Sequence, residues 1–551
     1  MSRKRHKPGP LPVDSEATAH EPFVLRHAAW LAVPFLALAA VFLCRDYGMA
    51  WDDAQHAIYG SYVLDYFLSG FKDMRWKTDI GGLYNYGTLF DLPSAVLHRW
   101  LGKDLFAYRN LLMALCGVLA VPAVAALGRR LGGQRAALFS VLALVLMPQF
   151  VGQSFMNCKD IPLATAMAWS LVALFALIDR PTLRAFLLFG AALGLTLSVR
   201  VGGGIMTGLF AAATVGWLFL RELLQGKQAQ AVRTALTNRW PLHALLAGLL
   251  AWLIMVAFWP FAHANPVLNP WEAFAQSTAF PISYPVLYLG QTWESAKLPW
   301  HYLPFMVALT MPVPILLLAL GGMALAGAAL LRSWKNHAGT FWFVLLFAVL
   351  FPPAYVILRN PNIYDGIRHF LFLLPPLAVL AGTAAATLAG TLQRRLGPTG
   401  ATITVAGFML VALPALIATH PYQYVFYNIL AGDKETLHER FETDYWLTSY
   451  KEAAGIIQAE QARAGRPLLV GVGANGLSIP CFTHFLDPKG GTQIGLFLGS
   501  SGQAAFPDKL DYTVCVPRYG MWRNFPEAPV FREIRRDGIL VCVIRRNPQA
   551  P

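Results

Sequence analysis

The stretch that decides the fold is AAWLAVPFLALAAVFLC at residues 28–44, followed closely by WDDAQHAIYG at residues 51–60. The first segment carries no charge and is close to the length of about 20 residues that crosses a bilayer as a helix. Two adjacent carboxylates, Asp52 and Asp53, follow at the point where a chain leaving the bilayer enters water. Because charge at this boundary is costly, the pair indicates a functional site.

Composition supports a membrane protein. The 551 residues are 56% hydrophobic and only 13% charged, whereas about a quarter of the residues of a soluble protein are charged. The net charge of +14 is concentrated in short loops between apolar runs, which is the pattern of topology signals facing anionic lipid. We therefore expect membrane lipids, and no nucleic acid, as partners.

About eleven segments are apolar enough to span the bilayer, and we expect a polytopic α-helical membrane protein. They lie at residues 27–44, 107–127, 136–152, 161–178, 184–200, 202–220, 242–260, 303–331, 341–358, 369–390 and 401–419. With this count, the loops rich in Lys and Arg all fall on one face, which the positive-inside rule makes cytoplasmic. Residues 86–101 are interrupted by charge and proline, and we expect a helix at the membrane interface there.

The chain divides into three parts by this reading. Residues 1–26 form a basic cytoplasmic tail, residues 27–419 a transmembrane domain with outer loops 45–106 and 261–302, and residues 420–551 a small extracytoplasmic α/β domain. In the last part we expect a helix over 448–461 and strands at 467–472, 512–516 and 539–544. A disulfide among Cys481, Cys515 and Cys542 is left open.

Asp52 and Asp53 are the first two residues of the first candidate site. If residues 51–59 are helical, neighbouring side chains point about 100° apart, so Asp52 and Asp53 do not form a dyad that shares a proton. One carboxylate then faces the active centre, lined by His56 and Tyr59 at helical spacing. The alternative is an ordinary aspartate N-cap.

Two further outer loops carry polar groups. In Asn157-Cys-Lys159-Asp160, a lysine at the membrane boundary can bind phosphate as a point charge, or it can simply snorkel towards headgroups.

The loop before residue 370 contains Asp365, Arg368 and His369, and this charge opposes the usual bias of outer loops. It suits a phosphorylated lipid headgroup, with a structural Arg368–Asp365 pair as the alternative. The aromatic residues of loop 261–302 are typical of the interface, with contact to a sugar or an acceptor as the alternative.

Together these motifs resemble the GT-C glycosyltransferases, in particular the bacterial branch related to protein O-mannosyltransferases and the lipid A aminoarabinose transferase. The resemblance rests on five short motifs along nearly the whole chain. They are Asp52-Asp53, Asn157-x-Lys159-Asp160-x-Pro162, Arg368-His369 before a proline-rich span, Tyr422–Asn428, and Arg440-Phe-Glu-x-Asp444-Tyr-Trp446. The family pair is usually Asp-Glu, so Asp53 stands where a glutamate is expected.

The resemblance implies an inverting transfer of a sugar from a polyprenyl-phosphate donor to a lipid, glycan or protein acceptor at the outer face of the cytoplasmic membrane. Asp52 would be the base, and Lys159, Arg368 and His369 would bind the donor phosphate. The sequence shows no cluster of metal ligands, so no cofactor is implied, although some relatives use a divalent ion. A transporter or flippase, and an envelope polysaccharide polymerase or ligase, are the alternatives.

Overall fold

The structure is a computed structural model that describes residues 23–78, 80–102, 105–278, 283–473, 479–487, 491–497, 503 and 505–549. Most of the expected basic tail, residues 1–22, lies outside the described residues. Residues 23–26 already belong to the first helix, α1 (Phe23–Leu43).

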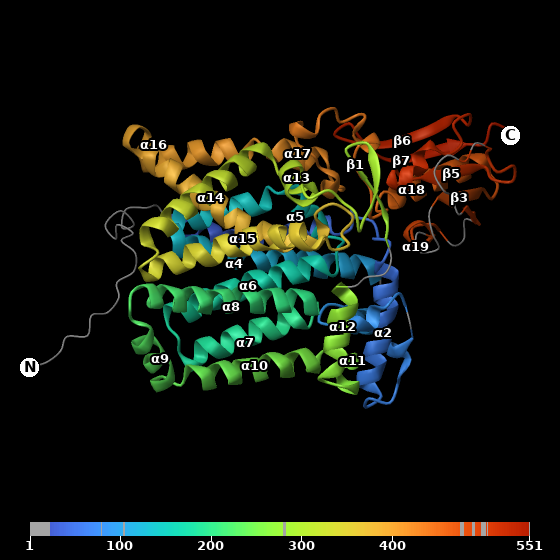
Figure 1. The fold of residues 1–551 in the computed structure, drawn as a ribbon. Coiled ribbons are helices and arrows are strands. Elements are labelled where there is room, and N and C mark those ends of the chain that lie inside the picture. Colours follow the sequence, from blue (N-terminus) through green and yellow to red (C-terminus); the bar gives the residue numbers. More distant parts are fainter. Residues whose placement is uncertain are drawn as a thin grey trace, which may run out of the picture.

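A bundle of long apolar helices forms the larger part of the molecule (Figure 1). Among the described residues, seven helices are long and apolar enough to cross a membrane. They comprise α4 (Leu105–Val145), α6 (Asp160–Asp179), α8 (Val201–Leu224), α10 (Trp240–Ala257), α14 (Val313–Ser333), α15 (His337–Arg359) and the run Arg368–Ala418, which contains α16 (Leu374–Leu410) and α17 (Leu413–Ala418). Shorter apolar helices, Ala29–Leu43 within α1 and α7 (Leu183–Leu197), complete the bundle. The expected polytopic helical fold is confirmed.

Two long helices each supply two of the expected spans. The backbone of α4 leaves helical geometry at Gly132 and Gly133, and that of α16 does so at Gly397. Glycine supplies the positive φ that such a reversal requires, 74° at Gly133 and 69° at Gly397. The seven long helices and the two shorter ones together therefore account for the eleven expected segments.

The structure corrects some expected boundaries. The expected span 303–331 is broken into α13 (Tyr302–Thr310) and α14, because Pro312 at the junction has no N–H with which to continue the first helix. Similarly, α4 ends before Pro148 opens the short helix α5 (Pro148–Gln153). The segment 86–101 contains only α3 (Asp91–Leu101), which is about 16 Å long and too short to span a bilayer.

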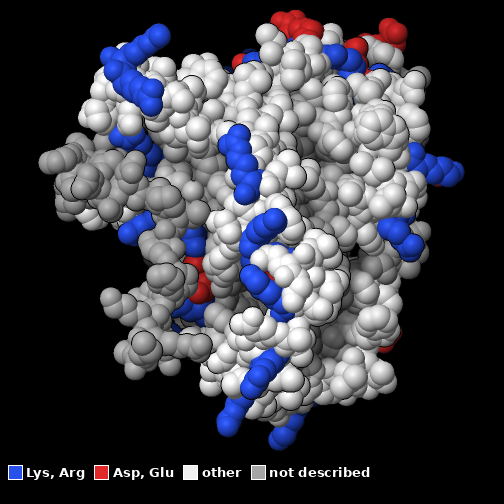
Figure 2. All heavy atoms as spheres, turned by 60° about the vertical axis from the view of Figure 1, so that its left-hand side comes forward, with Lys and Arg blue, Asp and Glu red and all other residues white. Residues whose placement is uncertain are grey.

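Basic side chains gather at one end of the bundle. This end carries α9 (Gln228–Thr237), at the left of Figure 1, whereas the C-terminal sheet lies at the right. In Figure 2, which turns the left-hand side forward, Lys and Arg predominate over Asp and Glu. Acidic residues present there are engaged, as in the Arg130–Asp179 pair at 2.6 Å. The arrangement is the one that the loop charges predict.

The other end carries the connecting elements of the outer loops. These are α2 (Asp53–Leu68), η1 (Arg75–Lys77), η2 (Leu83–Asn85), α3, α11 (Pro260–Ala264), α12 (Leu268–Thr278), the hairpin β1 (Pro285–Tyr288) and β2 (Gln291–Glu294), and η3 (Arg368–Leu373). Figure 1 shows α2, α11 and α12 standing together across the ends of the bundle helices.

The C-terminal part is a five-stranded sheet in the order β4-β3-β5-β7-β6. Its elements are α18 (Tyr450–Ala464), β3 (Leu469–Gly473), α19 (Ile479–Thr483), β4 (Gln493–Phe497), β5 (Tyr512–Cys515), η8 (Arg518–Arg523), β6 (Val530–Arg536) and β7 (Ile539–Arg546). β3 pairs in parallel with β4 and β5, and β7 pairs antiparallel with β5 and β6. The expected helix and three strands are present, and no disulfide joins any of the six cysteines, all of which lie among the described residues.

A buried polar joint connects this part to the bundle. It runs through η4 (Gln423–Val425), η5 (Ile429–Ala431) and η6 (Leu437–Glu439). Gln149 of α5 donates to the carbonyl oxygen of Tyr424 at 2.6 Å. The Tyr424 hydroxyl donates to Asp444, whose carboxylate also accepts from the backbone N–H of Ser449 at 3.0 Å. The motifs 422–428 and 440–446 therefore hold the two parts together, and one continuous apolar core extends through both.

The contact between α4 and α16 gives a first prediction. A Cβ on the buried Gly382 would lie 2.4 Å from the backbone nitrogen of Ser140, whereas a Cβ on Gly390 of the same helix would meet nothing within 4 Å. We expect Gly382→Ala to cost about 1–3 kcal/mol through overpacking, and Gly390→Ala to be neutral or stabilising because alanine favours helix. The apparent Tm in detergent measures both. Equal Tm values would contradict the close approach of the helices.

Candidate active site

Asp52 and Lys159 meet at the end of the bundle opposite the basic loops, although 107 residues separate them in the sequence. The Lys159 ammonium donates to Oδ2 of Asp52 at 2.6 Å. Asp52 occupies the N-cap position of α2, but its side chain makes no capping hydrogen bond. The Asp52 side chain is thus directed to the lysine and not to its own helix, which disfavours both the capping and the snorkelling alternatives.

Asp53 points elsewhere and belongs to a buried ion-pair network. Arg109, near the start of α4, donates from Nε to Oδ1 of Asp53 at 2.6 Å and from Nη2 to Oδ1 of Asp91 at 3.1 Å. It also donates to the Ser94 hydroxyl at 2.7 Å. Oδ2 of Asp91 pairs with Nδ1 of His56 at 2.8 Å. Since Arg109 and Asp53 are fully buried, the network fixes α2, α3 and α4 against one another.

The two adjacent carboxylates consequently have different acidities. Burial would raise the pKa of Asp52, but the charges of Lys159, His56 and Arg368 outweigh it and hold that pKa below its ordinary value. For Asp53, burial prevails over the nearby Arg109, and the pKa is raised. Asp52 is therefore the carboxylate that stays ionised, and it is buried less completely than Asp53, with 8% of its surface exposed against 0%.

A second cation lies beside Lys159. Arg200, at the N-terminus of α8, pairs with Asp160 at 3.2 Å. Asn157 fixes the loop, because its side-chain oxygen accepts from the backbone N–H of Asp160 at 2.8 Å and its amide donates to the Asp160 carboxylate at 3.0 Å. Lys159 and Arg200 both lie over the ring of Tyr86, at 5.4 and 5.6 Å from its centroid. The Tyr86 ring thus interacts with both cations.

A third cation comes from η3. Arg368 pairs with Asp365 at 3.1 Å and lies over the ring of Trp446 at 4.8 Å. Asp365 also pairs with Arg518 at 2.8 Å, and Arg518 in turn lies 5.0 Å from the ring centroid of Trp51. The structural Arg368–Asp365 pair is therefore present, and it draws η8 of the C-terminal sheet region to the residue that precedes Asp52.

Glu442 is the most unusual titratable group of this region. Its carboxyl is buried, and Oε2 has no hydrogen-bond partner among the residues that the structure describes. Burial and the neighbouring Asp365 raise the pKa of Glu442 to about 8, against the opposing charges of Arg518 and Arg368. The group is therefore protonated over most of the neutral range.

Tyr59 and His369 were also expected to belong to the site. Tyr59 packs in an aromatic cluster with Tyr66 and Trp76. His369 is half-buried and accepts from Nε of Arg368 at 3.3 Å. Tyr59 thus contributes to packing, and His369 adjoins Arg368 and is also close enough to feel the charges of Arg200 and Lys159.

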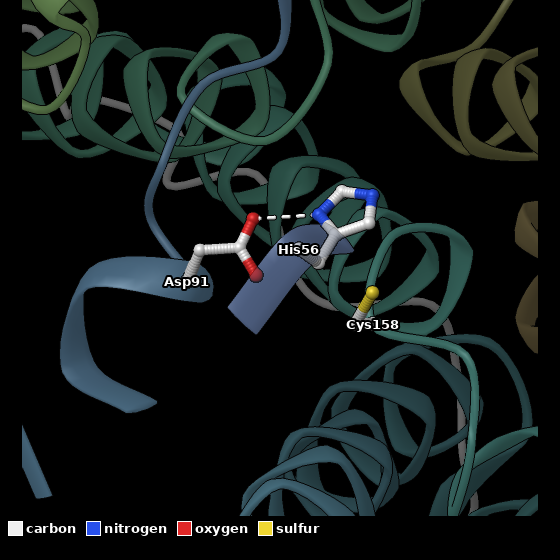
Figure 3. Close-up of side chains that lie close together, drawn as sticks. All are labelled: His56, Asp91 and Cys158. Carbon is white, nitrogen blue, oxygen red and sulfur yellow. Dashed lines mark hydrogen bonds and ion pairs between the residues drawn. The ribbon is translucent and has the colours of Figure 1, made fainter. Parts of the chain in front are cut away.

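Figure 3 shows His56 of α2, Asp91 of α3 and Cys158 of the loop before α6 pointing toward one another. Their ligand atoms lie within 4.8 Å of one another, a spacing that could hold a metal ion. However, Asp91 already faces the guanidinium of Arg109 at 3.1 Å and His56 at 2.8 Å. A fixed positive charge at this distance opposes a divalent cation, and burial raises the pKa of the Cys158 thiol well above its ordinary value. The arrangement favours an ion-pair network over a metal centre.

Sequence reasoning did not single out Asp91, Arg109, Arg200, Glu442 or Arg518. Arg109 and Arg200 stand at the ends of expected spans, where a cation is read as a membrane anchor. Both lie at the end of the bundle opposite the basic loops, and that departure from the charge bias could have marked them.

The fold and this site define a polytopic membrane protein of GT-C architecture, with a carboxylate paired to a cation at the ends of its helices opposite the basic loops. Residues 95–260 match the family model described as dolichyl-phosphate-mannose-protein mannosyltransferase. None of the curated proteins searched matches the chain significantly.

The similarity to solved structures extends over nearly the whole chain. The crystal structure of ArnT from Cupriavidus metallidurans bound to undecaprenyl phosphate is 16% identical, with 94% of this chain and 98% of that chain covered and a TM-score of 0.51. Its apo state is 15% identical, with the same coverage and a TM-score of 0.50. The archaeal oligosaccharyltransferase AglB from Archaeoglobus fulgidus is 11% identical, with 96% and 75% covered and a TM-score of 0.49. The GT-C fold expected from the motifs is confirmed by ArnT.

The Arg109 network gives a second prediction. Removing the cation of a buried network leaves uncompensated carboxylates, so we expect Arg109→Met to destabilise the protein by about 3–5 kcal/mol. The matched control is Arg99→Met, because Arg99 pairs with Asp65 at the surface with 55% of its side chain exposed, and exposed pairs contribute about 0–1 kcal/mol. The apparent Tm in detergent measures both, and a comparable small loss in both variants would contradict the network.

The raised pKa of Glu442 gives a third prediction. A carboxyl whose folded-state pKa is raised contributes stability below its unfolded pKa and loses that contribution as pH rises through about 8. We therefore expect the apparent Tm to fall between about pH 5 and 8, and Glu442→Gln to flatten this part of the profile. Glu435→Gln, at an exposed position, is the control. Parallel profiles for wild type and Glu442→Gln would refute the buried protonated state.

Proposed function

We propose that this protein is an inverting glycosyltransferase of the membrane that moves a sugar from a polyprenyl-phosphate donor to an acceptor. The observation that carries the proposal is the Asp52–Lys159 pair at 2.6 Å, with a candidate base and a candidate phosphate ligand in contact at one end of the helices. The likeness to ArnT, whose structure contains undecaprenyl phosphate, supports a lipid-phosphate donor. The mannosyltransferase family model supports sugar transfer.

The reaction needs one carboxylate. In an inverting transfer, the acceptor hydroxyl attacks the anomeric carbon while the bond from that carbon to the phosphate oxygen breaks. Asp52 takes the hydroxyl proton, and the polyprenyl phosphate leaves with the bonding electrons. Because a phosphate leaves readily as an anion, a general acid is unnecessary, and because no covalent intermediate forms, no second carboxylate is required beside Asp52. This agrees with the separate engagement of Asp53 by Arg109.

Donor binding would release the base. While Lys159 holds Asp52, the carboxylate is a weak proton acceptor, since the ion pair keeps its pKa low. A donor phosphate competes for the same ammonium, and when Lys159 turns to the phosphate, Asp52 regains basicity. The proposal therefore includes an order of events, in which the donor binds before the acceptor is deprotonated.

Further cations would stabilise the departing phosphate. Arg200 and Lys159 both lie over the ring of Tyr86. The charge of Arg368 helps to lower the pKa of Asp52. Cations fixed before the reaction stabilise the charge that develops on the leaving group. In this scheme His369 is a neighbour of Arg368, and Asn157, Asp160 and Asp365 position the cations.

The proposal also assigns the sides of the membrane. The end with the basic loops would face the cytoplasm, with the N-terminus on that side of the cytoplasmic membrane. The site and residues 420–551 would then be extracytoplasmic. An acceptor that is a lipid, a glycan or a protein is compatible with this placement.

Purified protein incubated with a panel of polyprenyl-phosphate sugars and with lipid, glycan and peptide acceptors tests the proposal through release of the carrier. We expect Asp52→Asn to lower kcat by about 10²- to 10⁴-fold, the usual contribution of general base catalysis. Lys159→Ala should raise the KM for the donor. Asp65→Asn changes a carboxylate of the same helix that pairs only with the surface arginines Arg75 and Arg99 among the described residues, and it should retain wild-type turnover.

Undiminished turnover in both site variants would overturn the assignment of Asp52 and Lys159. The absence of turnover with every donor, together with solute flux in proteoliposomes, would favour a transporter instead.

A further inference from the structure

A cavity of about 360 Å³ lies outside the candidate active site, where the first helix meets the C-terminal region. Its walls combine the end of α1, the start of α4 and residues of α18 and the segment after α19. Val41, Phe106, Leu111 and Phe485 contribute apolar surface. Because α1 ends and α4 begins at the same membrane boundary, the cavity extends from hydrocarbon depth to the level of the headgroups.

Two cations, Arg45 and Lys451, line this cavity. Arg45 follows α1 directly and is exposed. Lys451 of α18 donates from its ammonium to the carbonyl oxygens of Arg45 and, at 3.3 Å, of Tyr47. The neighbouring acidic residue, Asp46, pairs with His420 at 3.0 Å. Positive charge therefore prevails at the mouth of the cavity, at the end of the bundle opposite the basic loops.

On the side away from Arg45 and Lys451, the cavity adjoins an exposed apolar face of α1. Leu38, Val41 and Phe42 are 57%, 49% and 70% exposed, and with Arg45 they follow the spacing of one helix face. An apolar stripe thus leads to a cavity that ends in two cations. An acyl chain would lie along the apolar stripe, and an anionic headgroup would lie at the two cations. A free phosphate has no acyl chain for the stripe, and a neutral lipid has no net charge for the cations.

We propose that this cavity binds an anionic phospholipid of the outer leaflet, with its phosphate at Arg45 and Lys451 and an acyl chain along Val41 and Leu111. Such a lipid would brace α18 against α1. The inference is independent of the proposed sugar transfer, since none of the residues assigned to the base or to the donor phosphate lines the cavity.

Native mass spectrometry of the full-length protein in detergent, titrated with phosphatidylglycerol or phosphatidylcholine, tests the inference. We expect tighter binding of phosphatidylglycerol, and a Kd about fivefold weaker for each of Arg45→Gln and Lys451→Gln, since each cation contributes about 1 kcal/mol at an anionic surface. Arg332→Gln removes an exposed cation at the basic end of the bundle and should bind like wild type. Ala107→Phe, which fills the cavity, should reduce binding without removing charge.

Equal affinity for the two lipids, or a wild-type Kd in both charge variants, would overturn the site. Displacement of phosphatidylglycerol by undecaprenyl phosphate at lower concentration would assign the cavity to the carrier lipid and overturn its assignment to a bilayer phospholipid. If Ala107→Phe does not give a monodisperse protein, the two charge variants still decide the question. Turnover in the transfer assay is measured separately, so failure of one proposal leaves the other standing.

Discussion

The buried guanidinium of Arg109 forms the interactions on which the end of the molecule that carries the candidate site depends. It joins Asp53 of α2 to Asp91 of α3 from within α4, and His56 closes the network through the other oxygen of Asp91. A buried charge of this kind is tolerated only when its hydrogen bonds are satisfied. Since Asp53 is tied to this network, Asp52 at the preceding position is turned towards Lys159. The geometry of the candidate base is therefore a consequence of the position of its neighbour.

The bilayer imposes the second constraint. Helices satisfy their own backbone groups and can pass through hydrocarbon, whereas irregular segments must lie outside it or be enclosed by protein. The outer loops accordingly collect above the bundle, where the C-terminal region covers part of them. Arg518 illustrates the result, because it comes from beyond the last membrane helix and reaches Asp365 and the ring of Trp51. The C-terminal region contributes a side chain to the surroundings of the site as well as covering it.

The local patterns of the sequence predicted the long apolar helices, although not all of their boundaries. Apolar length and basic loops indicated the bundle and its polarity, and the adjacent carboxylates indicated where to look for a site. The pairing of residues was a different matter. Lys159 was predicted as a phosphate ligand, but its contact with Asp52 spans 107 positions, and nothing local specifies it. Arg200 and Arg109 resemble ordinary helix-end cations until the fold shows what they face. The break at Pro312 was visible in the sequence, but the long apolar run around it outweighed the proline.

Each cation of the candidate site is paired with a carboxylate, and this pairing affects how a phosphate can bind. Lys159 pairs with Asp52, Arg200 with Asp160 and Arg368 with Asp365. Three buried or half-buried cations without partners would be costly, and these pairs remove most of that cost. A phosphate that enters must therefore bind by exchange, replacing a carboxylate at one or more cations. Asp160 and Asp365 keep other partners after such an exchange, namely Asn157 and Arg518. Among the described residues, Lys159 is the only ion-pair partner of Asp52. A phosphate that binds Lys159 would therefore leave Asp52, the carboxylate proposed as the base, without an ion pair.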